Sequence, residues 1–276
     1  MKYIILFALS ALLWGCDGEI DSEYQQQIVV HGFIYADEAI DSVVLHYTSP
    51  YGQAVDDIAT AVSDADVRVR VDGKEFVLQP ATVKGRYFLP RSEHIVEGGK
   101  TYELLVKKDN HSVRAITSVP MSLKYTGLND SLPDDRILIL DTVNATTFRY
   151  GLTAGPIDKP GRLYMVYTTA LDTTFGKIPT NQNGPPVDTA AYARYGFIQT
   201  APNMRLYSRL FGWFGPNRIT MLALDSNWVD YKRAVGYGGQ AFISYQPSLN
   251  HVEGGIGVWA SAGRDTVTVF IKPKTN

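Results

Sequence analysis

The sequence predicts a mainly β protein: an N-terminal immunoglobulin-like or fibronectin-III-like β-sandwich, then a second β-rich domain with one short α-helix. Two observations predict this class. Apolar residues recur with a period of two along most of the chain, and Gly, Pro, Asn and Asp interrupt them at short intervals. The composition, with 45% hydrophobic residues, 20% charged residues and a single Cys, is that of a folded globular protein rather than a disordered or disulfide-stapled one.

Residues 1–15 have the shape of a secretory signal peptide. A basic start and an apolar run over residues 3–14 end at Gly15-Cys16. The run is shorter than the about 20 apolar residues of a membrane-spanning helix. Residues 13–16, Leu-Trp-Gly-Cys, resemble a bacterial lipobox, although Trp14 replaces the usual small residue. We expect Cys16 to be acylated and to become the mature N-terminus; ordinary secretory cleavage near Gly15 is the alternative.

Residues 16–27 are predicted to be the lipidated cysteine and an acidic tether. The segment contains few apolar side chains to bury, which is typical of a flexible spacer. Its acidic residues are Asp17, Glu19, Asp21 and Glu23. Acylation also explains the lone cysteine, because a free thiol on an exported chain is exposed to oxidation. Several acyl chains would hold the protein firmly on a membrane. An aspartate directly after the cysteine indicates inner-membrane retention in some bacteria, whereas the acidic cluster beyond it resembles a surface-export signal of Bacteroidetes lipoproteins.

Residues 28–120 are predicted to form the immunoglobulin-like sandwich. Valines alternate with arginines over residues 67–71, and Asp72-Gly73 then supplies the positive-φ positions of a hairpin turn. About seven such strands fit into the segment, the number expected of this fold. Tyr102 is predicted to form a tyrosine corner, and Pro120 to end the unit because proline cannot continue a strand ladder.

Residues 121–276 are predicted to form the second domain. Asp225 or Ser226 is expected to cap the helix, which continues to Val235 and ends at Gly236. A long loop rich in Pro and Asn is expected over residues 178–203, with a turn of helix at 190–195.

No catalytic or metal-binding motif stands out. The five histidines are scattered without the spacing of a zinc site, and Trp-Ala-Ser-Ala-Gly at residues 259–263 lacks the first glycine of a serine-hydrolase elbow. The chain has 26 basic and 28 acidic residues, so it lacks the excess of positive charge that is typical of nucleic-acid-binding proteins. We expect no metal, no cofactor and no enzymatic activity. A glycan or peptide hydrolase stays an alternative, because spacing along the chain does not reveal paired carboxylates.

Aromatic residues concentrate beside the long loop. Rings on loops are efficient anchors for peptides, sugars or partner proteins, so these residues form the candidate ligand-binding or partner-binding site. The alternative is that Leu206, Leu210, Phe211 and Trp213 form the core of the second domain while other rings stay exposed. The candidate site residues are Tyr192, Tyr195, Phe197, Tyr207, Trp213 and Phe214.

Several segments and the lipobox together share the pattern of one bacterial family. The segments are residues 28–34, 62–67, 99–104, 117–120 and 250–259. They resemble the Bacteroidetes outer-membrane lipoproteins known as domain of unknown function 4249. The most specific part is the ending, in which the resemblance gives Gly254, Gly255 and Gly257 as structural glycines and Trp259 as the expected aromatic. The chain is short for the family.

The resemblance implies a lipid-anchored protein of the outer membrane, on the cell surface rather than the periplasmic face. Genes of the family commonly lie beside those of TonB-dependent receptors, and no enzymatic role is established. We therefore expect a non-catalytic protein that helps a TonB-dependent transporter to capture or admit a small-molecule, peptide or glycan ligand. A structural or adhesive surface protein, with the first domain as a spacer, is a further alternative.

Overall fold

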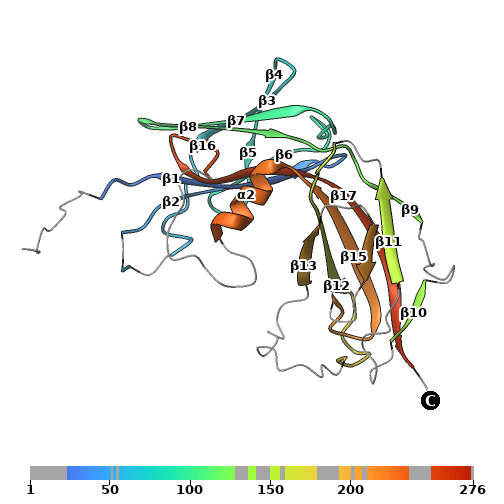
Figure 1. Cartoon of the computed structure of the whole chain (residues 1–276). Coiled ribbons are helices and arrows are strands. Elements are labelled where there is room, and N and C mark those ends of the chain that lie inside the picture. Colours follow the sequence, from blue (N-terminus) through green and yellow to red (C-terminus); the bar gives the residue numbers. More distant parts are fainter. Residues whose placement is uncertain are drawn as a thin grey trace, which may run out of the picture.

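The computed structural model of the chain describes residues 24–50, 52–53, 56–127, 136–140, 150–155, 159–178, 193–199, 203–206, 210–235 and 250–274. This part of the chain consists mostly of strands and contains one helix (Figure 1). The prediction of a mainly β protein with one short helix is therefore confirmed.

Two facing sheets form the first lobe. Its strands are β1 (Ile28–Tyr35), β2 (Ile40–Tyr47), β3 (Asp66–Val71), β4 (Lys74–Val77), β5 (Gln79–Pro80), β6 (Arg86–Leu89), β7 (Thr101–Lys108), β8 (His111–Ser118), β16 (Val252–Glu253) and the first part of β17 (Ile256–Pro273). One sheet has the order β17-β1-β2-β6-β5 and the other β16-β8-β7-β3-β4. Side chains alternate between core and solvent along most strands, so the apolar set of each strand meets in a single core.

The predicted hairpin of the first lobe is confirmed. β3 pairs antiparallel with β4, and the register places Val71 opposite Lys74. Asp72 and Gly73 hold φ values of 48° and 77°, as a two-residue turn between twisted strands requires.

A second sandwich forms the other lobe. Its elements are β9 (Lys124–Gly127), β10 (Ile137–Leu140), β11 (Tyr150–Gly155), β12 (Tyr164–Ala170), β13 (Ala193–Gln199), β14 (Asn203–Leu206), β15 (Gly215–Leu224) and helix α2 (Ser226–Val235). The order β13-β12-β15-β17 continues the large sheet of the first lobe, and β14-β11-β9 forms the small facing sheet. A second core fills the space between them.

β13 corrects part of the predicted loop over residues 178–203. Residues 193–199 form a strand, so the expected turn of helix at 190–195 is wrong from Ala193 onward. The strand pairs antiparallel with β12, whose backbone would otherwise end the sheet with unpaired groups. Tertiary pairing therefore decides the conformation, and local sequence does not.

One strand, β17, belongs to both lobes (Figure 1). Its first part pairs with β1 in parallel over residues 256–262, and its second part pairs with β15 over residues 262–271. Trp259 lies in the first core, whereas Val267, Val269 and Ile271 on the same face lie in the second. The first sandwich, expected within residues 28–120, therefore includes strands from the C-terminal end of the sequence.

The middle of β17 is buried on both faces, and its residues are small for that reason. Residues 258–263 are all buried. α2 packs with Ala260 and Ala262 on one face. On the other face the connection from β8 to β9 crosses the strand so closely that a Cβ on Gly263 would lie 2.1 Å from Met121 O. Larger side chains here would push the helix or the connection away from the strand.

Trp259 ties the two sheets of the first lobe together. The side chain is fully buried, and its Nε1 donates a hydrogen bond of 3.3 Å to the carbonyl of Tyr102 on the facing sheet. The ring lies against Gly32, its register partner on β1: a Cβ at Gly32 would be 2.6 Å from the ring atom Cε3. Tyr102 is buried too, and its hydroxyl accepts a hydrogen bond of 2.8 Å from the Glu97 amide, the contact of a tyrosine corner.

A buried polar network joins the helix to both lobes. Asp225 caps α2, because its Oδ1 accepts a hydrogen bond of 2.9 Å from the Trp228 amide. Its Oδ2 accepts one of 2.5 Å from Thr117 on β8, whose hydroxyl also lies 2.7 Å from the Ser261 hydroxyl on β17. Burial raises the pKa of the Asp225 carboxyl, although these hydrogen bonds oppose the shift.

We predict that Gly32→Ala lowers the free energy of unfolding by about 1–3 kcal/mol, because the new methyl group overlaps a ring that cannot move. Urea unfolding measures the loss. The matched test is a double-mutant cycle with Trp259→Phe, whose smaller ring makes room. If the double variant loses the full sum of the two single effects, the contact between Gly32 and Trp259 is not the cause.

We predict a pH-dependent difference between the wild type and Asp225→Asn. The folded pKa of Asp225 lies above the unfolded value of 3.8, so its ionisation favours the unfolded chain. The wild type should therefore lose stability relative to the Asn variant as the pH rises from ~4 to ~7. Melting temperatures of both proteins across this range measure the difference. If the wild type instead gains stability relative to the Asn variant as the pH rises, the ionised carboxylate stabilises the junction.

Candidate binding surface

Exposed apolar side chains and lysines gather where the second lobe ends. The end of β12, the loop after it, the start of β15 and the end of β17 meet here, since Leu171 N donates to Pro216 O and Phe214 N to Gly176 O. We call the surface that they form the tip surface. It consists of Leu171, Phe175, Lys177, Trp213, Phe270 and Lys272.

Aromatic rings and ammonium groups are paired across the tip surface. The Lys177 Nζ lies 5.3 Å from the centre of the Trp213 ring, and Lys272 Nζ lies 5.9 Å from that of Phe270. Phe175 meets Phe270 edge to face, with 5.1 Å between the ring centres. Such contacts fix the orientation of the rings while the lysine amines remain able to reach solvent.

Gly215 makes the position of Phe175 possible. A Cβ at Gly215 would lie 2.4 Å from the ring atom Cδ2 of Phe175, and the glycine φ of 89° is one that residues with side chains rarely adopt. The backbone at the start of β15 is therefore shaped around this ring.

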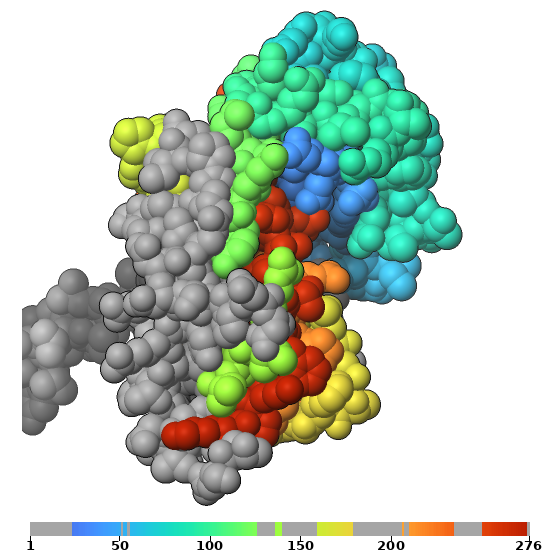
Figure 2. Space-filling view, turned by 90° about the vertical axis from the view of Figure 1, so that its right-hand side faces the viewer, coloured from blue at the N-terminus to red at the C-terminus, as the bar shows by residue number. Residues whose placement is uncertain are grey.

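Phe175 and the aliphatic side chains of the tip surface stay exposed, and Trp213 and Phe270 are partly exposed. Phe175 is 50% exposed and Leu171 44%, and neighbouring Ile139 on β10 is 54% exposed. Figure 2 shows the end of β17, in red, lying on the surface beside residues 136–140. Contiguous exposed apolar side chains on a folded protein are typical of an interaction surface.

The structure divides the residues that the sequence proposed for this site. Trp213 is half-buried and belongs to the tip surface. Phe214 packs against the second core, and Leu206, Leu210 and Phe211 are buried within it. The core interpretation thus applies to these residues and not to Trp213.

The other candidate residues lie partly or wholly outside the described part of the chain. The backbones of Tyr195 and Phe197 lie in β13. Tyr192, Tyr207 and the proposed lipidation site Cys16 lie outside the described residues.

Sequence reasoning missed Leu171, Phe175 and Phe270. Phe270 lies between Val269 and Ile271 in a predicted strand. The period of two by itself would therefore have placed Phe270 on the face opposite to these two core residues. Phe175 follows two threonines and precedes Gly176, and a large ring in such a polar turn is a usable signal of exposure. No local signal could bring them together, because their contact depends on the pairing of β15 with β17.

The glycines of the C-terminal motif allow backbones to approach closely. A Cβ at Gly254 would lie 2.1 Å from Ser112 O, and one at Gly255 would lie 2.6 Å from Ile28 O. Gly257 has a φ of 116°, and a Cβ there would lie 2.0 Å from Val30 O. These residues and Trp259 thus hold β17 against β1 and β8, which is a structural role.

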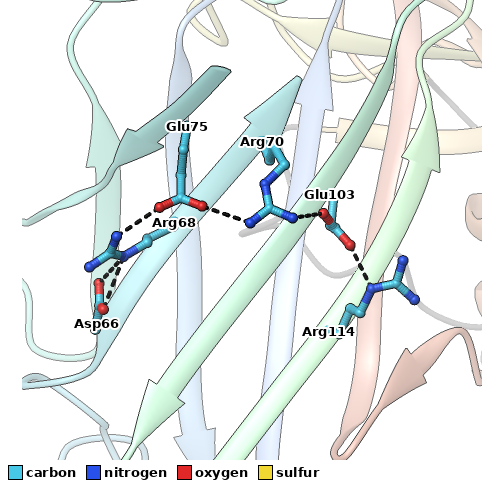
Figure 3. Close-up of polar contacts among 6 residues, drawn as sticks. All are labelled: Asp66, Arg68, Arg70, Glu75, Glu103 and Arg114. Atoms are coloured by element: carbon cyan, nitrogen blue, oxygen red, sulfur yellow. Dashed lines mark hydrogen bonds and ion pairs between the residues drawn. The ribbon is translucent and has the colours of Figure 1, made fainter. Parts of the chain in front are cut away.

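The outer face of the β16-β8-β7-β3-β4 sheet carries a chain of ion pairs (Figure 3). Glu75 pairs with Arg68 at 2.7 Å and with Arg70 at 2.9 Å; Glu103 pairs with Arg70 at 2.8 Å and with Arg114 at 2.5 Å. Each arginine is thus neutralised by a carboxylate. This face therefore offers no concentrated positive charge to a polyanion.

The described residues hold no candidate metal site, and the serine of the incomplete elbow is buried. Among them, no group of three or more His, Cys, Asp or Glu residues could hold a metal ion. Ser261, the serine of the incomplete elbow, is fully buried and bonded to Thr117. In this part of the chain no helix is long and apolar enough to cross a bilayer.

Comparison with known proteins gives a family match. Residues 17–236 match the model of a family described as a domain of unknown function, DUF4249. No curated protein sequence matches the chain. Among solved structures, Escherichia coli alpha-2-macroglobulin activated by porcine elastase is similar, with 10% identity and a TM-score of 0.21. The match covers 90% of this chain but 20% of that one, and a similarity this low carries no argument.

We predict stability effects of very different size for two phenylalanines of this lobe. Phe211→Ala should lower the free energy of unfolding by about 3–5 kcal/mol, because the ring is 1% exposed in the second core. Phe175→Ala should change it by less than about 1 kcal/mol, because half of that ring already contacts water. Chemical denaturation of both variants tests this. A large loss for Phe175→Ala would assign the ring to the core.

Proposed function

The chain belongs to the DUF4249 family, and we propose that it is a non-catalytic lipoprotein of the outer membrane, a capture partner of a TonB-dependent transporter. In this proposal Cys16 carries the lipid, the acidic tether spaces the body from the membrane, and the two lobes form a rigid body that presents a binding surface. The family match supports the lipid anchor only indirectly, because the outer-membrane location of the family comes from the sequence resemblance.

The observation that carries the proposal is the tip surface. A soluble β protein normally covers large apolar side chains, yet Leu171 and Phe175 remain about half exposed beside Trp213. Exposed aromatic residues on a rigid scaffold are the usual anchors of a protein interface. A capture role needs such a surface, whereas a simple spacer does not.

The length of β17 separates the tip surface from the start of β1, where the proposed tether joins the body. β1 starts beside the first residues of β17, because Val29 is the register partner of Ile256. Phe270 and Lys272 lie at the other end of β17, up to about 50 Å along the strand. The body can therefore be held at one end and make contact with its other end (Figure 1).

We predict that Cys16→Ala moves the protein from the membrane fraction into the soluble fraction, because a chain without its acyl groups loses most of its membrane affinity. Cell fractionation measures the location of each protein, and mass spectrometry of the wild-type N-terminus measures the acylation of Cys16. The exposed Val83→Ala change on the first lobe is the matched control. A wild type with an unmodified thiol would falsify the lipid anchor.

Partnership with a transporter is tested by purifying the acylated wild type from native membranes in mild detergent. Stoichiometric recovery of a β-barrel receptor supports the proposal. Phe175→Ala and Trp213→Ala should each weaken this recovery without lowering the amount of folded protein. If both variants recover the same receptor at the wild-type ratio, the tip surface is not its docking site. If the wild type recovers none, the partnership is wrong.

A further inference from the structure

We propose that the tip surface makes a second, direct contact with the anionic lipid surface of the membrane, so that the body leans onto the bilayer beside its anchor. The inference depends on the proposed function only for the tether; the lipid contact itself is a property of the folded body. It concerns the chemistry of exposed side chains rather than any particular receptor.

The cations of the tip surface differ from the paired arginines on the outer sheet face of the first lobe. Arg68, Arg70 and Arg114 on the first lobe each have carboxylate partners. Lys177 and Lys272 are exposed, and no ion pair to them forms among the described residues.

The acidic group nearest in sequence to Lys177 is Asp172, whose hydrogen bonds within its own turn lower the pKa of its carboxyl, so that it stays negatively charged. Asp172 Oδ1 accepts hydrogen bonds from the amide and the hydroxyl of Thr174, at 2.8 and 2.7 Å. Arg218, exposed on β15, adds a further cation two residues from Pro216, the partner of Phe270. Lys177, Lys272 and Arg218 therefore outnumber the Asp172 carboxylate beside the apolar side chains of the tip surface, in a chain whose acidic residues outnumber its basic ones overall.

This combination matches the interface of a bilayer. Leu171, Phe175 and Ile139 project apolar groups that can enter the boundary between headgroups and acyl chains. The Lys177 and Lys272 ammonium groups lie over the rings of Trp213 and Phe270, and their flexible stems allow them to reach the headgroup level. Anionic headgroups complement these cations, and a bilayer needs no pocket in the protein.

The tether is long enough to allow this contact. Its limited length restricts how the body is oriented on the membrane. The 12 residues 16–27 span at most about 40 Å when extended, and less while Tyr24 and Gln27 are hydrogen-bonded to Thr48. The tip surface lies up to about 50 Å from the start of β1 along β17. A body that touches the bilayer with its tip while its tether is anchored must therefore lean rather than stand upright. Anchoring also raises the local concentration of the tip at the membrane, so a weak contact suffices.

The test uses the unacylated chain from Asp17 to Asn276, which retains every described residue. Sedimentation with phosphatidylglycerol vesicles should capture the protein, whereas pure phosphatidylcholine vesicles should capture much less. Emission of Trp213 should shift to the blue on binding, because Trp228 and Trp259 are already buried at 6% and 0% exposure. Trp213→Phe should therefore bind with little spectral change.

Variants assign the contact to the tip surface. Lys177→Ser and Lys272→Ser should each lower the vesicle partition coefficient about fivefold, and the loss should shrink at high salt. Lys84→Ser on the first lobe is the matched control and should leave binding unchanged. Phe175→Ala should also weaken binding, with Val83→Ala as its control.

Three outcomes overturn the inference: no capture by anionic vesicles, equal losses in the tip and control variants, or binding of a soluble polyanion such as polygalacturonate without vesicle binding. The last result would assign the surface to an acidic glycan. Because the chain in this experiment lacks the acyl groups, failure here leaves the proposed lipid anchor and transporter partnership intact.

Discussion

The structure depends on one strand that two cores share. β17 enters the first lobe beside β1 and continues into the second beside β15, with one face directed into both cores in turn. Because a strand transmits its position along its whole length, the two sandwiches cannot turn freely about a linker. The polar network at Asp225 and the helix α2 lie against the same stretch of the strand. The junction is therefore packed on both sides.

The sequence of β17 follows from what covers each part of it. Trp259 fills the first core, and Gly32 on β1 leaves room for its ring. Alanine, serine and glycine follow where helix and connecting chain press on both faces, since larger side chains would not fit. Alternation returns from Arg264, where one face is again open to water. A single strand thus carries three different packing environments.

Polar and apolar groups are arranged differently on the two lobes. On the first lobe, arginines and glutamates neutralise one another across neighbouring strands, so the sheet face is soluble but has little net attraction for charged partners. At the far end of the second lobe, lysines lie over exposed rings instead. The proposed functions rest on this difference. In these proposals the lobe next to the tether is a solvated scaffold, and the distant lobe carries the surface that makes contact.

The sequence by itself determined the strand content, the hairpin at Asp72-Gly73 and the helix after Asp225, because period-two alternation, positive-φ turn residues and a capping carboxylate are local signals. It also identified the family. Only the tertiary structure decided that β17 completes the first sandwich, that residues 193–199 form a strand, and that Phe175, Trp213 and Phe270 share one surface. Those features depend on pairings between residues far apart in the chain. A local pattern shows which face of a strand is apolar, but it does not show which strand lies beside it.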